Sequence, residues 1–163
     1  SNMMGTKTDG TLWMWGWQEY GTLGQNQGGE AHRSSPTQIP GTTWSTGDFK
    51  IATGEGNSYG IKTDGTMWAW GNAQSDALGL NNTTQRSSPT QIPGTTWNKV
   101  FCQSQSVFTT KTDGTLWCWG RNHRGQLGQN TGSSIGSPRQ LGTDIGWIDV
   151  ASGTYFTLMA QSK

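Results

Sequence analysis

The chain has 163 residues, of which 30% are hydrophobic and 13% are charged, and its formal net charge is +1 at pH 7. Both fractions lie below those of an ordinary globular chain, roughly 45–50% and about 25%. Ten tryptophans nevertheless indicate a folded protein, because each buried indole removes about 150–250 Å² from water. The small net charge gives no electrostatic drive toward nucleic acid or an anionic membrane. No stretch approaches the ~20 apolar residues of a membrane span, so we expect neither partner.

The first four residues, Ser-Asn-Met-Met, lack the charged and apolar regions of a secretion signal, and the first two resemble a tag remnant. Two cysteines, Cys102 and Cys118, are too few for a disulfide framework or a metal site. We therefore expect no secretion signal and no structural metal, and the sequence assigns no compartment.

A ten-residue segment occurs three times, at 7–16, 62–71 and 111–120. Each copy reads Lys-Thr-Asp-Gly-Thr-x-Trp-x-Trp-Gly. Residues 34–44 return unchanged at 87–97 and in degraded form between 137 and 147. Self-similarity of this kind predicts a repeat architecture. We predict a single domain over residues 1–163, with repeats at approximately 7–61, 62–110 and 111–161.

Each repeat reads as short strands. The Asp-Gly pair between residues 59–63 and 66–70 predicts a hairpin with a type I′ turn, in which both central residues have φ > 0. Trp68 and Trp70 share one face of the second strand, while Met67 and Ala69 take the other. Two apolar faces predict sheets stacked face to face, and a glycine ends the strand where a side chain would crowd the turn. The Ser-Ser-Pro segment starts another extended strand.

A period of about 50 residues with roughly four strands is typical of a β-propeller blade. The marks of WD and kelch repeats are absent. Residues 119–128, Trp-Gly-Arg-Asn-His-Arg-Gly-Gln-Leu-Gly, and 150–158 instead resemble the regulator-of-chromosome-condensation repeat. Repeat one keeps Gly21 of this motif, and repeat two has Asp76 in its place. The resemblance implies an all-β chain of β-propeller blades, each a four-stranded antiparallel sheet, with three blades per chain.

Three blades are too few for a closed ring, since propellers typically have about 4–8. Residues 4–7 and 158–161 both align with 59–62, so the same strand is encoded at both ends. An open arc would expose a tryptophan-lined face and a strand edge. We expect either a piece of a longer propeller or a homo-oligomer, most simply a two-fold dimer of six blades.

Function is expected where the repeats differ, because a shared blade geometry explains the identical positions. The main difference is the loop after each Trp-Gly, at 17–20, 72–75 and 121–124, and the second is the excursion before the proline strand. An exposed Trp and Tyr here would suit an interface anchor, and the basic residues of the third loop would suit a carboxylate or phosphate. Coverage of a neighbouring loop and plain solvation are the alternatives. The candidate partner-binding residues are Trp17, Glu19, Tyr20, Gln74, Asp76, Arg121, His123 and Arg124.

No motif for catalysis, a cofactor or a metal is present. The repeated Asp9, Asp64 and Asp113 suit hairpin turns better than acid–base chemistry. His32 and His123 lack a second ligand at metal-binding spacing. No nucleophile elbow, Walker or dinucleotide pattern occurs. We therefore expect a protein that is not an enzyme.

The first functional hypothesis is a non-catalytic scaffold that presents variable loops to an unidentified protein partner and assembles with itself. The resemblance supports this class, since the family includes an exchange factor for a small GTPase and a bacterial inhibitor of β-lactamases. Neither activity is expected here, because the sequence has no motif that matches the protruding wedge of the exchange factor and no basic tail that would bind chromatin. The second hypothesis is a lectin-like propeller that uses exposed tryptophans with Asn26, Asn81 and Asn130. The third is a structural piece of a larger surface or virion protein.

Overall fold

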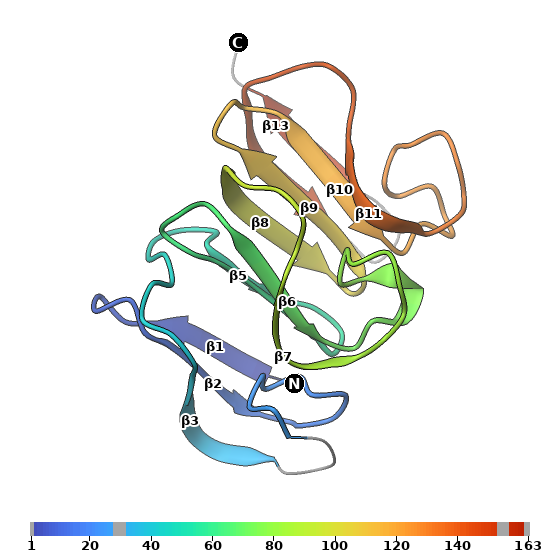
Figure 1. Ribbon diagram of the computed structural model, residues 1–163. Helices are drawn as coiled ribbons and strands as arrows, with labels where there is room; N and C mark the ends of the chain where they lie inside the picture. The colour runs from blue at the N-terminus through green and yellow to red at the C-terminus, as the bar shows by residue number, and fades with distance from the viewer. Residues whose placement is uncertain (1, 28–31, 153–156, 162–163) are drawn as a thin grey trace.

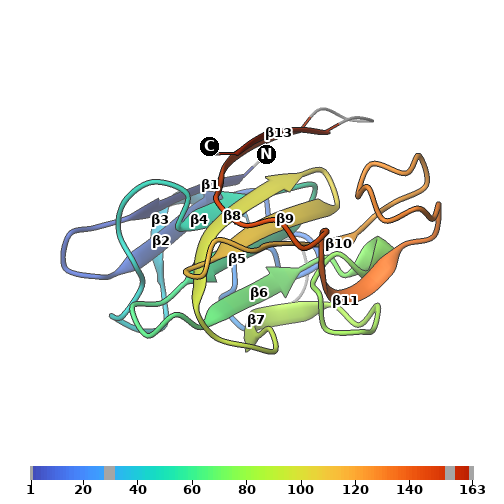
Figure 2. The same ribbon diagram turned by 90° about the horizontal axis from the view of Figure 1, so that it is seen from above.

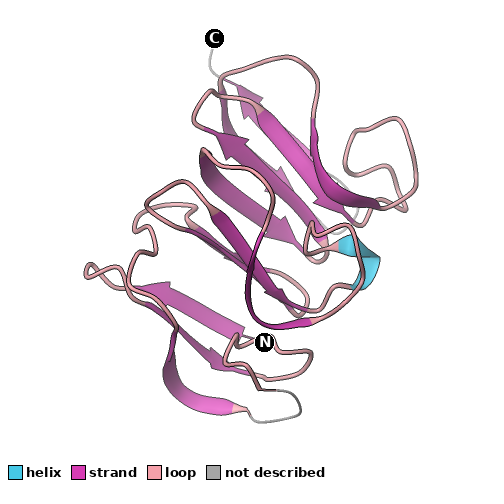
Figure 3. Ribbon diagram, viewed as in Figure 1, coloured by secondary structure: helices cyan, strands magenta, loops and turns pink. Residues whose placement is uncertain are grey.

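The computed structural model describes all residues except 1, 28–31, 153–156 and 162–163. The described strands are β1 (Asn2–Thr6), β2 (Leu12–Gly16), β3 (Arg33–Ile39), β4 (Ile51–Thr53), β5 (Asn57–Ile61), β6 (Met67–Gly71), β7 (Arg86–Gln91), β8 (Trp97–Gln103), β9 (Ser106–Lys111), β10 (Leu116–Gly120), β11 (Ile135–Gln140), β12 (Trp147–Ser152) and β13 (Thr157–Gln161). Helix in the described residues is confined to a 3-10 turn, η1 (Gln74–Asp76), as Figure 3 shows. No described helical segment has the length and apolarity that a bilayer crossing requires. The predicted all-β class is confirmed.

The strands pair in chain order into four antiparallel sheets. The first sheet contains β1, β2 and β3, the second β4–β7, the third β8–β11, and the fourth β12 and β13. Figure 1 shows them following one another in a stack from the N-terminal to the C-terminal end. Figure 2 shows β4 and β8 on one side of the molecule and β7 and β11 on the opposite side. This is the blade arrangement that the sequence predicts.

The number of strands in each sheet corrects one detail of the prediction. Only the second and third sheets have four strands, and they lie between a three-stranded and a two-stranded sheet in the described chain. Each four-stranded sheet takes its first two strands from the end of one predicted repeat and its last two from the start of the next. The pairing registers confirm that β1, β5 and β13 are the same strand of the repeat. Tyr59 in β5 pairs with Ala52 before it and Ala69 after it. Met4 pairs with Met14 in the second of these ways, and Leu158 pairs with Ala151 in the first. The repeat boundaries themselves stay a prediction.

The turn between β5 and β6 differs from the predicted type I′ turn. Gly65 has φ +79°, whereas Asp64 is not among the residues with positive φ. The amide of Gly65 donates to the Lys62 carbonyl at 3.0 Å, and the Lys62 amide donates to the Thr66 carbonyl at 2.9 Å. The Asp64 carboxylate accepts hydrogen bonds from the amide and hydroxyl of Thr66 at 2.9 and 2.7 Å. The predicted type I′ turn is wrong because the Asp64 carboxylate binds the amide and hydroxyl of Thr66. The loop is therefore longer than two residues and contains one left-handed residue, Gly65.

The joints between successive sheets are built around buried tryptophans. Trp70 in β6 and Trp119 in β10 are fully buried. The Trp70 indole donates to the Thr22 carbonyl of the preceding segment at 3.0 Å, and Trp119 donates to the Ala77 carbonyl at 2.8 Å. Burying one indole supplies roughly 4–6 kcal/mol of gross hydrophobic energy. The predicted face-to-face stacking is confirmed.

Glycines leave room for the backbone and the indoles at these joints. A Cβ on Gly24 or Gly79 would lie 2.9 Å from the indole nitrogen that packs there. Gly71 has φ +99°, and a Cβ on it would lie 2.3 Å from the Gly56 carbonyl oxygen. The third-sheet counterpart of Gly71, Gly120, meets the Gln105 carbonyl oxygen in the same way at 2.1 Å. The predicted role of the strand-ending glycines is therefore confirmed.

The first tryptophan of each ten-residue segment lies at the turn end of its sheet. Its indole nitrogen donates to the threonine hydroxyl two residues earlier, and the lysine ammonium of the same decamer lies over its ring. The three indole–hydroxyl distances are 2.8 Å (Trp13–Thr11), 2.9 Å (Trp68–Thr66) and 2.8 Å (Trp117–Thr115). The ammonium–ring distances are 4.1 Å (Lys7), 4.0 Å (Lys62) and 4.3 Å (Lys111). The invariant residues of the decamer are thus accounted for by the architecture.

Candidate functional site

The loops after β6 and β10 are joined by main-chain hydrogen bonds to the turns that precede β5 and β9. The Asn72 amide donates to the Gly56 carbonyl at 2.7 Å, and the Arg121 amide donates to the Gln105 carbonyl at 2.9 Å. The Glu55 amide donates to the Ser104 carbonyl at 2.9 Å and links the two turns. We call this surface the loop face; it comprises residues 17–20, 54–57, 72–76, 104–106 and 121–124. It lies at the opposite end of the strands from the Asp-Gly hairpins.

A depression of about 230 Å³ opens on the loop face. The structure brings together four of the predicted residues there, Trp17, Glu19, Tyr20 and Gln74. The remaining lining residues are Glu55, Gly56, Asn72 and Gln105. A neighbouring hollow of about 300 Å³ shares Tyr20, Asn72 and Gln74 and reaches Ser75, Thr83 and Gln85. The predicted first and second loops therefore form one continuous surface.

Two aromatic rings stand at this depression. Trp17 and Tyr20 are each 38% exposed, and their ring centroids lie 6.3 Å apart at an interplanar angle of 76°. Tyr20 holds φ +56°, a left-handed conformation that costs about 1–3 kcal/mol for a bulky residue. A hydrogen bond with Glu19 and the charge of that carboxylate raise the pKa of the Tyr20 phenol. Exposed, rigid aromatics of this kind are the residues that anchor protein interfaces.

Glu55 and Gln105 were missed by the sequence reasoning. Both lie in the turns between the first two strands of a sheet, Glu55 between β4 and β5 and Gln105 between β8 and β9. These turns differ between the two copies, Glu55-Gly56 in one and Ser104-Gln105 in the other. A comparison of the turns, like the comparison made for the loops, would have found them.

Asp76 lies at the joint between the second and third sheets. It has φ +60° and occupies the place of Gly21 and Gly125, which have φ +77° and +71°. Aspartate tolerates this conformation better than most residues. A Cβ placed on Gly136 would lie 3.4 Å from the Asp76 carboxylate. The departure from the repeat motif at Asp76 therefore keeps the backbone geometry that the glycine provides elsewhere.

The basic residues of the third loop form a separate part of the loop face. His123 and Arg124 are exposed, and Arg121 is half-buried. Buried Asn122 holds the loop, because its amide donates to the Thr131 carbonyl at 2.7 Å and its oxygen accepts from the Leu127 amide at 2.9 Å. The loop face thus has an acidic and aromatic part over the first two sheets and a basic part over the third.

The repeated aspartates and the two cysteines have structural surroundings in the described part of the chain. Asp9, Asp64 and Asp113 lie in the hairpin turns, where hydrogen bonds from the side chain and backbone of the threonine two residues later lower their pKa. Burial raises the pKa of the Cys102 thiol to about 12 and that of Cys118 to about 11. No three His, Cys, Asp or Glu side chains in the described ranges gather as metal ligands would.

The residues of the lectin hypothesis have backbone roles. Asn26, Asn81 and Asn130 all hold φ between +53° and +56°, where asparagine is tolerated. The Asn26 amide donates to the Ser87 carbonyl at 2.7 Å, and the Asn81 amide donates to the Gly136 carbonyl at 2.6 Å. Their repetition is explained by these turns, and fully buried Trp70 and Trp119 cannot stack on a sugar.

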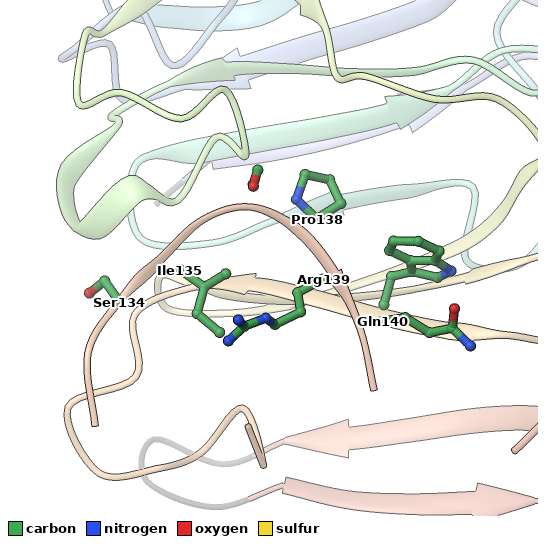
Figure 4. A pocket seen from close by; sticks show the side chains of 7 residues that line it. Ser134, Ile135, Pro138, Arg139 and Gln140 are labelled. Atoms are coloured by element: carbon green, nitrogen blue, oxygen red, sulfur yellow. The ribbon is translucent and has the colours of Figure 1, made fainter. Parts of the chain in front are cut away.

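A hollow of about 630 Å³ lies along β11 (Figure 4). Its lining residues are Trp117, Ser134, Ile135, Ser137, Pro138, Arg139 and Gln140. Arg139 is the one charged side chain among them, and no carboxylate, histidine or thiol lines the hollow. We therefore place the candidate site at the loop face and not at this groove.

Stacked antiparallel sheets joined by buried indoles define the chain as a run of β-propeller blades. A family model, the regulator of chromosome condensation (RCC1) repeat, matches it three times, over residues 9–53, 64–108 and 113–160. The chain therefore belongs to the RCC1 repeat family. The sequence-based assignment is confirmed.

Related proteins extend well beyond this chain. Regulator of chromosome condensation from Xenopus laevis is 33% identical over 87 residues, which is 53% of this chain and 20% of that protein. Human WBSCR16 shares the fold with a TM-score of 0.84 at 21% identity, over 99% of this chain and 42% of that one. Yeast RCC1 (Prp20), solved bound to Kap60, gives 0.83 at 17% identity, over 99% and 41%. The chain thus spans less than half the length of each of these proteins.

Proposed function

We propose that the chain is a non-catalytic β-propeller scaffold that binds a protein partner through its loop face. The observation that carries this proposal is the gathering of exposed Trp17 and Tyr20 with Glu19 and Gln74 at one depression. These residues differ among the repeats, whereas the tryptophans of the blade joints and the glycines that they pack against do not. Binding of protein partners by solved relatives supports the class: Prp20p from Saccharomyces cerevisiae has been studied for its binding to Gsp1p and histones, and yeast RCC1 has been solved with Kap60.

The test is affinity capture with the wild-type chain and with a Trp17→Ala/Tyr20→Ala double variant. The proposal expects specific proteins that the wild type retains and the double variant loses. Ile145→Ala is the matched control, because Ile145 is an exposed apolar residue that lies beside Gly114 in a hairpin turn at the other end of the strands. Loss of the same proteins by Ile145→Ala, or their retention by the double variant, would overturn the proposal.

Self-assembly is the second part of the proposed function. Trp15 is the first-sheet counterpart of Trp70 and Trp119, but it is only half-buried. With Trp13, Lys7 and Pro36 it borders a hollow of about 340 Å³. At the other end of the chain, Gly128 corresponds to Gly24 and Gly79. A Cβ on Gly128 would meet only the Leu141 side chain, at 3.4 Å.

At each internal joint, the indole of one sheet packs on a glycine of the preceding sheet. Trp15 and Gly128 are the unmatched indole and glycine of the same kind at the two ends of the chain. In a two-fold pair of chains, one copy of the duplicated strand (β1 or β13) would yield its place, so that β12 of one chain and β2 and β3 of the other share a single copy of that strand in one four-stranded sheet. Matching each Trp15 to the Gly128 region of the other chain would then cover both faces and make a six-bladed ring. Sedimentation at micromolar concentration should give twice the chain mass of 17.7 kDa. Trp15→Ala should shift the mass toward the monomer, while Trp17→Ala should leave it unchanged. A wild-type monomer would contradict self-assembly and leave the loop-face proposal standing.

A further inference from the structure

The size of the loop-face depression limits what it accepts. Its volume is about 230 Å³, whereas pockets for small molecules usually measure about 300–1,000 Å³. Its mouth is bordered by exposed side chains, so a group can enter from outside. These dimensions suit one side chain of a partner protein.

The charge of the depression selects the kind of side chain. Glu19 enters from the loop after β2, and Glu55 enters from the turn between β4 and β5. Glu55 accepts a hydrogen bond from the Ser104 hydroxyl at 2.7 Å, and Glu19 is hydrogen-bonded by Tyr20. These neutral hydroxyl groups orient the carboxylates without cancelling their charge. The lining residues include no lysine, arginine or histidine.

The aromatic rings point to the same ligand. Lysine ammonium groups lie 4.0–4.3 Å from the rings of Trp13, Trp68 and Trp117. This geometry is that of a cation–π contact. None of the cation–ring pairs found in the described part of the chain involves Trp17 or Tyr20. Among the described residues, the exposed Trp17 indole thus lies beside two carboxylates and has no lysine of this chain over its ring, unlike the indoles of Trp13, Trp68 and Trp117.

The depression is held in shape by its own hydrogen bonds. Buried Gln18 accepts from the Leu23 amide at 2.8 Å and donates to the Gln27 carbonyl at 2.7 Å. The Thr22 hydroxyl donates to the Trp17 carbonyl at 2.9 Å. A preorganised loop loses little conformational entropy when a partner binds.

We propose that this depression receives one cationic side chain, a lysine or arginine of the protein partner, between the carboxylates of Glu19 and Glu55 and the rings of Trp17 and Tyr20. The proposal rests on the loop-face function proposed above and names the chemistry that the face recognises. The carboxylates supply charge, and the indole supplies a face for the cation.

The test is an NMR titration with three acetylated and amidated pentapeptides, Gly-Ser-X-Ser-Gly, in which X is lysine, arginine or N-acetyl-lysine. The indole N–H signal of Trp17 is identified by its loss in Trp17→Phe. We expect this signal to shift, in a saturable way, with the lysine or arginine peptide and not with the acetyl-lysine peptide, which keeps the shape but lacks the charge. No shift with either cationic peptide at about 10 mM, or an equal shift with acetyl-lysine, would overturn the proposal.

A matched pair of variants separates the site from general charge. Glu19→Gln/Glu55→Gln should weaken binding of the cationic peptide about 2- to 30-fold, as expected for two exposed ion pairs. Asp48→Asn/Asp144→Asn removes the same charge from exposed positions outside the loop face and should leave binding unchanged. Equal weakening by both pairs would contradict the site. If partner capture depends on Trp17 while the cationic peptides fail to bind, the loop-face function stands and the cation site falls.

Discussion

Two tryptophans of similar sequence neighbourhood differ in what surrounds them. Trp70, at the joint between the first and second sheets, is fully buried and donates to the Thr22 carbonyl. Trp17, which follows the corresponding strand of the first sheet, is 38% exposed beside Glu19 and Tyr20. The first recurs in every repeat and the second occurs once. The tryptophan that recurs in every repeat therefore builds the contact between sheets, whereas the tryptophan that occurs once faces outward.

The sharpest way to break this comparison is to remove an indole from a joint. Trp70→Ala should lower the free energy of unfolding by about 3–5 kcal/mol, because it leaves a cavity between two sheets. Trp15→Ala should cost the isolated subunit less, because Trp15 is only half-buried. Urea denaturation of both variants, measured at concentrations where the wild type and Trp15→Ala have the same mass, is the measurement. Equal losses would show that the joints are not the principal source of stability.

The glycine that ends each decamer should come next in effect. Gly71→Ala places a Cβ 2.3 Å from the Gly56 carbonyl oxygen at φ +99°, so it should cost roughly 2–4 kcal/mol through backbone strain and crowding. Gly132→Ala is the control, since its Cβ would have no neighbour within 4 Å and its φ is not left-handed. That variant should stay within about 0.5 kcal/mol of the wild type, and a similar loss in both would refute the role of Gly71.

A smaller effect is expected from the turn carboxylates. Hydrogen bonds from Thr11, Thr66 and Thr115 lower the folded-state pKa of Asp9, Asp64 and Asp113 below their ordinary value of 3.8. A depressed pKa contributes stability that is present above the unfolded pKa and is lost as the pH falls through the folded pKa. The triple Asp→Asn variant should therefore be less stable than the wild type at pH 7, and the difference should shrink below pH 3.8. Thermal unfolding across this range checks it, and a constant difference would contradict it.

The smallest effect on stability is expected at the loop face. Trp17→Ala should change the free energy of unfolding by less than about 0.5 kcal/mol, because the indole borders an open depression and does not lie in a joint. The same variant should weaken binding of the lysine peptide, followed on the backbone amide signal of Glu55 because the Trp17 indole signal is lost. A loss of stability comparable with that of Trp70→Ala would place Trp17 in the architecture and remove the contrast between the two regions.

The fold could be predicted from the sequence because the ten-residue segment occurs three times. The spacing of its two tryptophans indicates a strand with two apolar faces. The turn type was wrong because Asp64 and Thr66 act together, which the Asp-Gly pair alone does not reveal. Four of the candidate residues line one depression, and their binding role stays a prediction. Trp17, Glu19, Tyr20 and Gln74 meet because their loops follow equivalent strands of adjacent sheets. Glu55 and Gln105 escaped because stacking of the sheets, and not local sequence, brings their turns to the same depression.

The partner that receives each buried indole is a main-chain oxygen. The Ala77 carbonyl accepts both the Trp119 indole at 2.8 Å and the Tyr59 hydroxyl at 2.6 Å, and the Thr22 carbonyl accepts Trp70. Since every amino acid carries that oxygen, the hydrogen bond does not constrain the residue type at the accepting position, and Thr22, Ala77 and Gln126 stand at the three equivalent positions. A gene can therefore copy a unit and rewrite its outward segment without a compensating mutation in the neighbouring unit, which gives such rings a simple evolutionary route to new recognition surfaces.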